Sequence, residues 1–139
     1  MNLTYKMRKK SKKILTEISA GELLDKISIL EIKLDKIKDK ENLYEIDKEY
    51  KSLNETKKSH LEITPDIQNL IDQLKNVNIK LWSIEDEKRI CEKNKDFSEK
   101  FIELARNVYI NNEKRAKIKS EINKLLGSNI KEVKKYANY

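Results

Sequence analysis

The 139-residue chain has the length of one domain, and it contains only two glycines and one proline. This scarcity of helix breakers, with abundant Lys, Glu, Ile, Leu and Asn, disfavours strand-and-turn architectures and predicts an all-α fold. The formal charge of +7 arises almost wholly before the first acidic residue, Glu17, so a folded basic face typical of nucleic-acid binding is not indicated.

Cysteine and histidine usage excludes further classes of protein. Cys91 is the only cysteine, which rules out an internal disulfide and favours the cytoplasm. The only histidine, His60, falls in a predicted linker, and no Glu-x-x-His pair occurs, so we expect no metal site and no cofactor. No apolar stretch is long enough for a membrane span or a signal-peptide core, so neither membrane insertion nor secretion is expected.

The first elements in chain order are an arm and a helix. Residues 1–16 lack a sustained apolar period and are predicted to form a flexible basic arm, ahead of a single helical domain at 17–139. Ser19, with Glu22 three residues later, has the pattern of a capping box that begins a helix. The spacing of four and three residues that keeps one helix face on a partner is found at Leu23, Ile27, Leu30, Leu34 and Ile37.

A second helix is predicted to begin after the polar stretch at 38–42 and to end near Lys58. This helix would form an antiparallel hairpin with the first. Its apolar positions are Leu43, Ile46, Tyr50 and Leu53. After a linker at 59–63, Thr64 and Pro65 mark the start of the third helix, because proline at the first helical position loses no hydrogen bond. We expect this helix to be the longest, with a stripe at Ile67, Leu70, Leu74, Val77, Leu81 and Ile84.

The chain is expected to turn again at Asn94 to Asp96, and Asp96 or Ser98 would cap a fourth helix. Gly127 would end that helix and leave a short C-terminal tail. The tail has the spacing of one or two amphipathic turns at Ile130, Val133, Tyr136 and Tyr139. The prediction is therefore an antiparallel bundle of about four helices, built from two long helical hairpins with a short tail.

The fourth apolar stripe is interrupted in its middle, where Asn111 and Arg115 occupy stripe positions. This interruption predicts a polar layer across an apolar seam. If the third and fourth helices pair antiparallel about residue 96, Glu85 and Asp86 would meet Arg106. The same register would bring Trp82 near Tyr109, and Asn78 near Arg115.

This layer gives the candidate binding cluster. Three of the four arginines belong to it, and arginine holds phosphates or carboxylates bidentately in a way that lysine does not. Interhelical salt bridges that fix the register are the favoured interpretation, with a ligand site as the alternative, and Trp82 is favoured as a core anchor over a stacking platform. The residues of this cluster are Trp82, Glu85, Asp86, Arg89, Arg106, Tyr109, Asn112, Arg115 and Lys119.

A second polar set lies beside the first stripe. Asp25, Lys26, Ser28 and Glu31 would line a cleft or be solvated, and the solvated interpretation is favoured. The secondary polar face consists of Glu22, Asp25, Lys26, Glu31, Asn78 and Asn123.

Four segments together resemble a small family of bacterial and phage helical domains of unknown function, over about residues 17–139. They are GELLDKISILEIKLDKI at 21–37, LWSIEDEKRICE at 81–92, FIELARNVYINNEKRAKIKSEIN at 101–123 and LLGSNIKEVKKYANY at 125–139. The resemblance implies a genomic setting beside genes for lipopolysaccharide and other surface-polysaccharide synthesis. It also implies that the recurring polar positions are those of the candidate binding cluster and of the secondary polar face, together with Glu92.

Three functions follow from these patterns. The first is a non-catalytic binding or accessory module for an anionic small molecule such as a nucleotide sugar, or for a protein partner, with self-association through a leftover stripe that includes Leu24, Ile29 and Ile32. The second is a metal-free helical enzyme of general chorismate-mutase design, with Glu85 or Asp86 as base. The third is nucleic-acid binding through the basic arm, which the charge placement disfavours.

Overall fold

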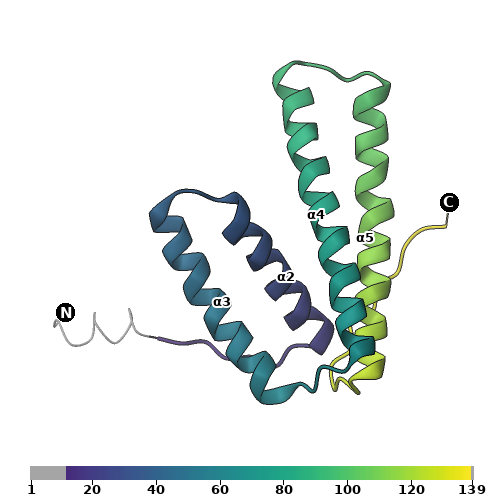
Figure 1. Ribbon diagram of the computed structural model, residues 1–139. Helices are drawn as coiled ribbons and strands as arrows, with labels where there is room; N and C mark the ends of the chain where they lie inside the picture. Colours follow the sequence, from purple (N-terminus) through teal and green to yellow (C-terminus); the bar gives the residue numbers. More distant parts are fainter. Residues whose placement is uncertain (1–11, 139) are drawn as a thin grey trace, which may run out of the picture.

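The computed structural model describes residues 12–138, so most of the predicted basic arm lies outside the described residues. Within this range the protein is all-α, as predicted, with four helices and no β-strand. The helices form two antiparallel hairpins that diverge from a common base (Figure 1). In chain order they are α2 (Ala20–Lys36), α3 (Lys40–His60), α4 (Pro65–Lys93) and α5 (Glu99–Leu125).

Two predicted helix starts are confirmed by their capping bonds. The Ser19 side chain accepts a hydrogen bond from the backbone N–H of Glu22 at 3.1 Å and begins α2. Thr64 accepts from the backbone N–H of Ile67 at 3.3 Å and begins α4, with proline in the first turn. The N-cap of α5 is Ser98, whose side chain makes no capping bond.

The ends of the elements differ from the prediction in two places. Helix α3 continues to His60, past the predicted end at Lys58, so the linker before α4 is only 61–64. The tail at 126–138 contains no helix, and the predicted amphipathic turns are wrong. Val133 stays 90% exposed, so the tail buries too little apolar surface to stabilise a helix of one or two turns.

Helix α2 is the packing centre of the molecule. It contacts α3, α4 and α5, whereas within the described chain α3 contacts only α2. Leu24 of α2 packs into one apolar core with Leu74 of α4 and Ile122 of α5. Because Leu24 and Ile32 are 2% and 3% exposed, the expectation of a leftover exposed stripe at these positions is wrong.

A second apolar core lies in the outer part of the α4–α5 hairpin, formed by Ile84, Cys91 and Leu104. Between the two cores Asn78 and Asn111 are buried, which confirms the predicted polar layer. As expected, α4 is the longest helix, with 29 residues. No helix among residues 12–138 has the length and apolar character needed to cross a membrane.

Candidate functional site

The polar layer is organised around a buried carboxylate on α2. Asp25 is 0% exposed and is bound by Arg115 of α5 through Nε, at 3.0 Å to Oδ1 and 3.2 Å to Oδ2, and through Nη2. Asn78 of α4 donates to Asp25 Oδ1 at 2.9 Å and to the Ser28 hydroxyl at 3.3 Å. The hydrogen bonds from the guanidinium and from the Asn78 amide replace those that the carboxylate would make to water. The expectation that Asp25 is solvated is therefore wrong.

A second ion-pair group lies one helical turn away, around Lys119 of α5. Its Nζ is 2.6 Å from Glu22 Oε2, 3.6 Å from Glu132 Oε1 in the tail and 3.8 Å from Asp25 Oδ2. The Lys119 side chain is only 13% exposed, so these contacts are weakly screened by solvent. Lys26 adds a longer pair with Glu22 at 3.7 Å. The α2 helix, the α5 helix and the tail are thus joined through one ammonium group.

These contacts set the charge states of Glu22 and Arg115. Burial alone would raise the pKa of Glu22, but the hydrogen bond and charge of Lys119, with smaller effects from Glu132 and Lys26, bring that pKa below its ordinary value. The hydrogen bond from Asp25 raises the pKa of Arg115, against the opposing effect of burial. Both groups are therefore charged at neutral pH.

Acidification is expected to destabilise the protein through Glu22. Because its pKa is lowered on folding, its contribution is complete above the ordinary value of 4.5 and is lost as the pH falls through the lower value of the folded state. Urea unfolding of wild type and Glu22→Gln across this range measures the effect, and the variant should lose less stability than wild type on acidification. Glu121→Gln on α5, an exposed position, is the control and should follow wild type. Identical pH profiles for wild type and Glu22→Gln would contradict this assignment.

The first turn of α2 is fixed by α5 and the tail. The backbone N–H of Gly21 donates to Asn123 Oδ1 at 2.7 Å, and that of Ala20 donates to the Ser128 hydroxyl at 3.1 Å. These N–H groups have no partner within the helix, so the side chains of α5 and the tail complete the cap. The position of Asp25, one turn farther along α2, depends on this attachment.

Beside the Asp25 carboxylate is a groove of about 510 Å³, here named the α2/α4/α5 groove. It lies where α2 meets α4 and α5, at the point from which the two hairpins diverge (Figure 1). Its lining residues are Ile29 and Ile32 from α2, Asn78, Leu81, Trp82, Glu85, Asp86 and Arg89 from α4, and Asn112 and Arg115 from α5.

Several polar groups of the groove have no partner within residues 12–138. Arg89, Asp86, the Asn112 amide, the Trp82 indole N–H and Nη1 of Arg115 make no hydrogen bond or ion pair to the described residues. No buried side-chain nitrogen or oxygen in this part of the chain lacks a partner, so these groups reach solvent. The groove therefore offers donors and acceptors that the fold itself does not use.

The structure brings together six of the nine residues of the predicted cluster, all of them in this groove. Trp82, predicted as a core anchor, belongs to neither apolar core and is half-buried in the groove wall. Lys119 lies outside the groove in the neighbouring ion-pair group. The other two do not line it: Tyr109 is 41% exposed, and Arg106 donates to Glu103 of its own helix at 2.9 Å.

The predicted pairing of Glu85 and Asp86 with Arg106 is wrong. Glu85 pairs at 3.4 Å with Lys88, one turn along α4, and Arg106 pairs with a residue one turn along α5. Exposed long side chains satisfy their charges locally, because a partner three residues away needs no interhelical alignment.

Sequence reasoning also missed the partner of Arg115 and the role of the tail. The predicted register concerned α4 and α5, whereas the carboxylate that binds Arg115 comes from α2. Of the secondary polar face, Glu31 lies apart and pairs with Lys75 at 3.7 Å. Glu132 has no sequence signal, because nothing in a short polar tail predicts where it folds back.

Comparison with known proteins places the chain in a family without identifying a relative of known structure or activity. No curated protein and no solved structure matches it. A family model matches residues 14–139, which begins three residues before the domain boundary predicted at residue 17 and includes every residue discussed above. The chain therefore belongs to the family of unknown function DUF6165.

Proposed function

We propose that this protein is a helical binding module that holds an anionic polar small molecule in the α2/α4/α5 groove. The observation that carries the proposal is the set of unpartnered groups there, above all the guanidinium of Arg89 and Nη1 of Arg115. Guanidinium groups bind phosphates and carboxylates through paired hydrogen bonds. A site with two of them suits a ligand that carries such a group.

The other groove residues suit the rest of such a ligand. Trp82 offers a half-buried aromatic face for a sugar or nucleobase ring, with Ile29 and Ile32 as apolar neighbours. Asp86 and Asn112 supply acceptors and donors for hydroxyl groups. Asn78 and Arg89 are separated by eleven steps of 1.5 Å along the helix, or about 16 Å, which suits an elongated molecule rather than a single ion. A nucleotide sugar or a sugar phosphate has this combination of groups.

The resemblance noted from the sequence supports the same class of ligand. It implies a genomic setting beside genes for surface-polysaccharide synthesis, in which nucleotide sugars are the activated donors. We therefore propose an accessory role in such a pathway, with ligand binding as the molecular activity.

Binding can be measured through Trp82, the only tryptophan in the chain. Titration with a nucleotide sugar, a sugar phosphate and a dicarboxylate should change tryptophan fluorescence for one class and raise the melting temperature of the protein. Arg89→Ala should weaken this binding about tenfold or more, because it removes a charged hydrogen-bond donor. Since Arg89 is exposed and makes no hydrogen bond or ion pair with the described residues, the variant should unfold like wild type.

Arg106→Ala is the matched control. It removes the same side chain from an exposed position of α5, where the guanidinium is paired with Glu103 outside the groove. It should bind the ligand like wild type. Equal weakening by the two variants, or no response to any of the three ligand classes, would show that the groove is not an anion-binding site.

A further inference from the structure

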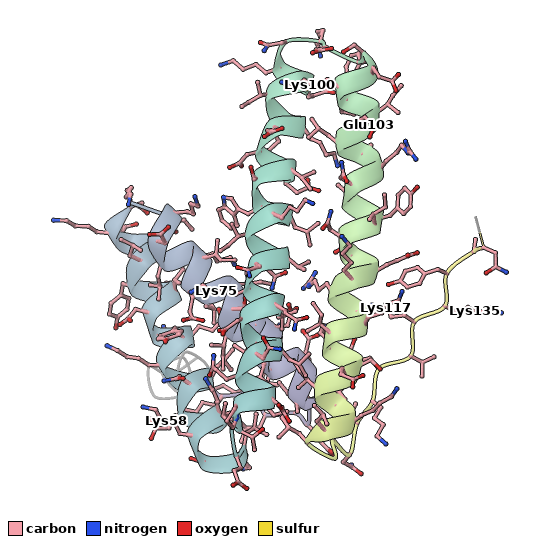
Figure 2. The ribbon with its side chains drawn as sticks, turned by 45° about the vertical axis from the view of Figure 1, so that its right-hand side comes forward. Lys58, Lys75, Lys100, Glu103, Lys117 and Lys135 are labelled. Atoms are coloured by element: carbon pink, nitrogen blue, oxygen red, sulfur yellow. The ribbon has the colours of Figure 1, made fainter. Side chains whose placement is uncertain are left out.

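A second hollow, of about 280 Å³, lies on the other side of Arg115, between α5, the start of α2 and the tail. It is here named the tail hollow. Its polar lining includes Glu22, Lys119, Glu132, Lys134 and Tyr136, and it shares Arg115 and Asn112 with the α2/α4/α5 groove. Figure 2 shows the tail, with Lys135, passing beside α5 near the level of Lys117.

The tail enters this hollow through one loosely held carboxylate. Glu132 Oε1 is 3.6 Å from Lys119 Nζ and 3.5 Å from the Ser19 hydroxyl, longer than a good hydrogen bond, and the side chain is 35% exposed. By contrast, Glu22 is 2.6 Å from the same ammonium group.

The charges of the hollow favour an anion in place of Glu132. Without it, the lining cations Arg115, Lys119 and Lys134 remain with only the carboxylate of Glu22 and that of Asp25, which is paired with Arg115. This leaves an excess of positive charge, which favours an anion such as phosphate. At 3.5 and 3.6 Å, Glu132 makes no short hydrogen bond with Ser19 or Lys119, so both donors can bind an anion more closely.

Glu132 is also the last polar attachment of the tail. Among the described residues past Ile130, it alone makes a hydrogen bond or an ion pair. A ligand that takes its position would therefore detach residues 131–138 from α5. Binding of a ligand at the position of Glu132 and release of the tail are therefore coupled.

We propose that the tail hollow is a phosphate-binding site, centred on Lys119 and occupied in the free protein by the carboxylate of Glu132. A phosphate group, as the free ion or in an ester, displaces Glu132 and releases the tail. This site shares only Arg115 and Asn112 with the groove proposed above as the ligand site, and neither proposal depends on the other.

Calorimetric titration with inorganic phosphate tests the site directly. Glu132→Gln removes the competing charge at nearly constant shape and should bind phosphate about tenfold more tightly than wild type. Glu121→Gln makes the same charge change at an exposed position of α5 outside the hollow and should bind like wild type. A parallel titration with a sugar phosphate separates the free ion from an ester, and the gain in Glu132→Gln is expected for both.

Three results would overturn the proposal. The first is equal phosphate affinity in wild type and Glu132→Gln, and the second is no phosphate binding by Glu132→Gln. The third is a loss of phosphate affinity in Arg89→Ala with none in Lys119→Met, which would place the anion in the groove and leave the function proposed above intact. NMR relaxation of the backbone amides gives an independent measure, since phosphate should increase the fast motion of residues 131–138 of wild type, and unchanged relaxation would contradict release of the tail.

Discussion

Asp25→Ala is expected to lower the free energy of unfolding by about 3–5 kcal/mol, the largest loss we predict for a single polar residue of this protein. The substitution leaves the half-buried Arg115 guanidinium and the buried Asn78 amide without their common acceptor. An uncompensated charge in a position shielded from water costs far more than the net stabilisation that the intact pair provides. Urea unfolding followed by circular dichroism measures the change.

Asp35→Ala is the matched control for this loss. Asp35 lies on the same helix but is exposed, and its side chain makes no ion pair within the described residues, so the change should stay within about 0.5 kcal/mol. A double variant, Asp25→Leu with Arg115→Met, removes both charges and should recover part of the loss. If Asp25→Ala unfolds at the same urea concentration as Asp35→Ala, the carboxylate does not organise the polar layer.

The local parts of this fold could be predicted because they depend on neighbouring residues. The hydroxyl and the proline that begin a helix act within one turn, so the starts at Ser19 and Thr64 were found from the sequence. The interruption at Asn111 likewise predicted a polar layer, because an amide at a stripe position must lie in the seam. Helix order and hairpin pairing followed from short connections.

The site could be predicted only in part, because its contacts join residues far apart in the chain. Six cluster residues meet in the groove, and all six lie on α4 or α5. Their approach could be predicted because the turn near residue 96 pairs these two helices antiparallel. The crossing of α2 over these helices could not be worked out in this way, so Asp25 was expected in solvent. Arg106, an exposed charge, was predicted to pair with residues of the facing helix, whereas its partner lies on its own helix.

The crossing of α2 over α5 rests on a glycine, which leads to the second large effect. A Cβ built at Gly21 would lie 2.6 Å from the carbonyl oxygen of Lys119 and 3.0 Å from Asn123 Oδ1. The nearest obstacle is backbone, so the two helices must separate to admit a methyl group. The absence of a side chain at Gly21 therefore sets how closely Asp25 can approach Arg115.

Gly21→Ala is expected to destabilise the protein by about 3 kcal/mol, as overpacking against a rigid backbone does. The sign of this change in the free energy of unfolding is informative, because the same substitution inside an ordinary helix stabilises a protein by about 1 kcal/mol. Urea unfolding measures the sign, and the ligand response of Trp82 should weaken with it, since the groove lies between the helices that move apart. Both effects have the same cause.

Gly127→Ala separates this close approach from the conformational cost of replacing a glycine. Gly127 has a φ of +61°, and nothing lies within 4 Å of a Cβ built there. Its replacement should cost about 1 kcal/mol from the left-handed backbone alone and leave the Trp82 response unchanged. If Gly21→Ala is instead as stable as wild type or more so, α2 tolerates a wider crossing, and the geometry that joins Asp25 to Arg115 does not depend on contact between the two backbones.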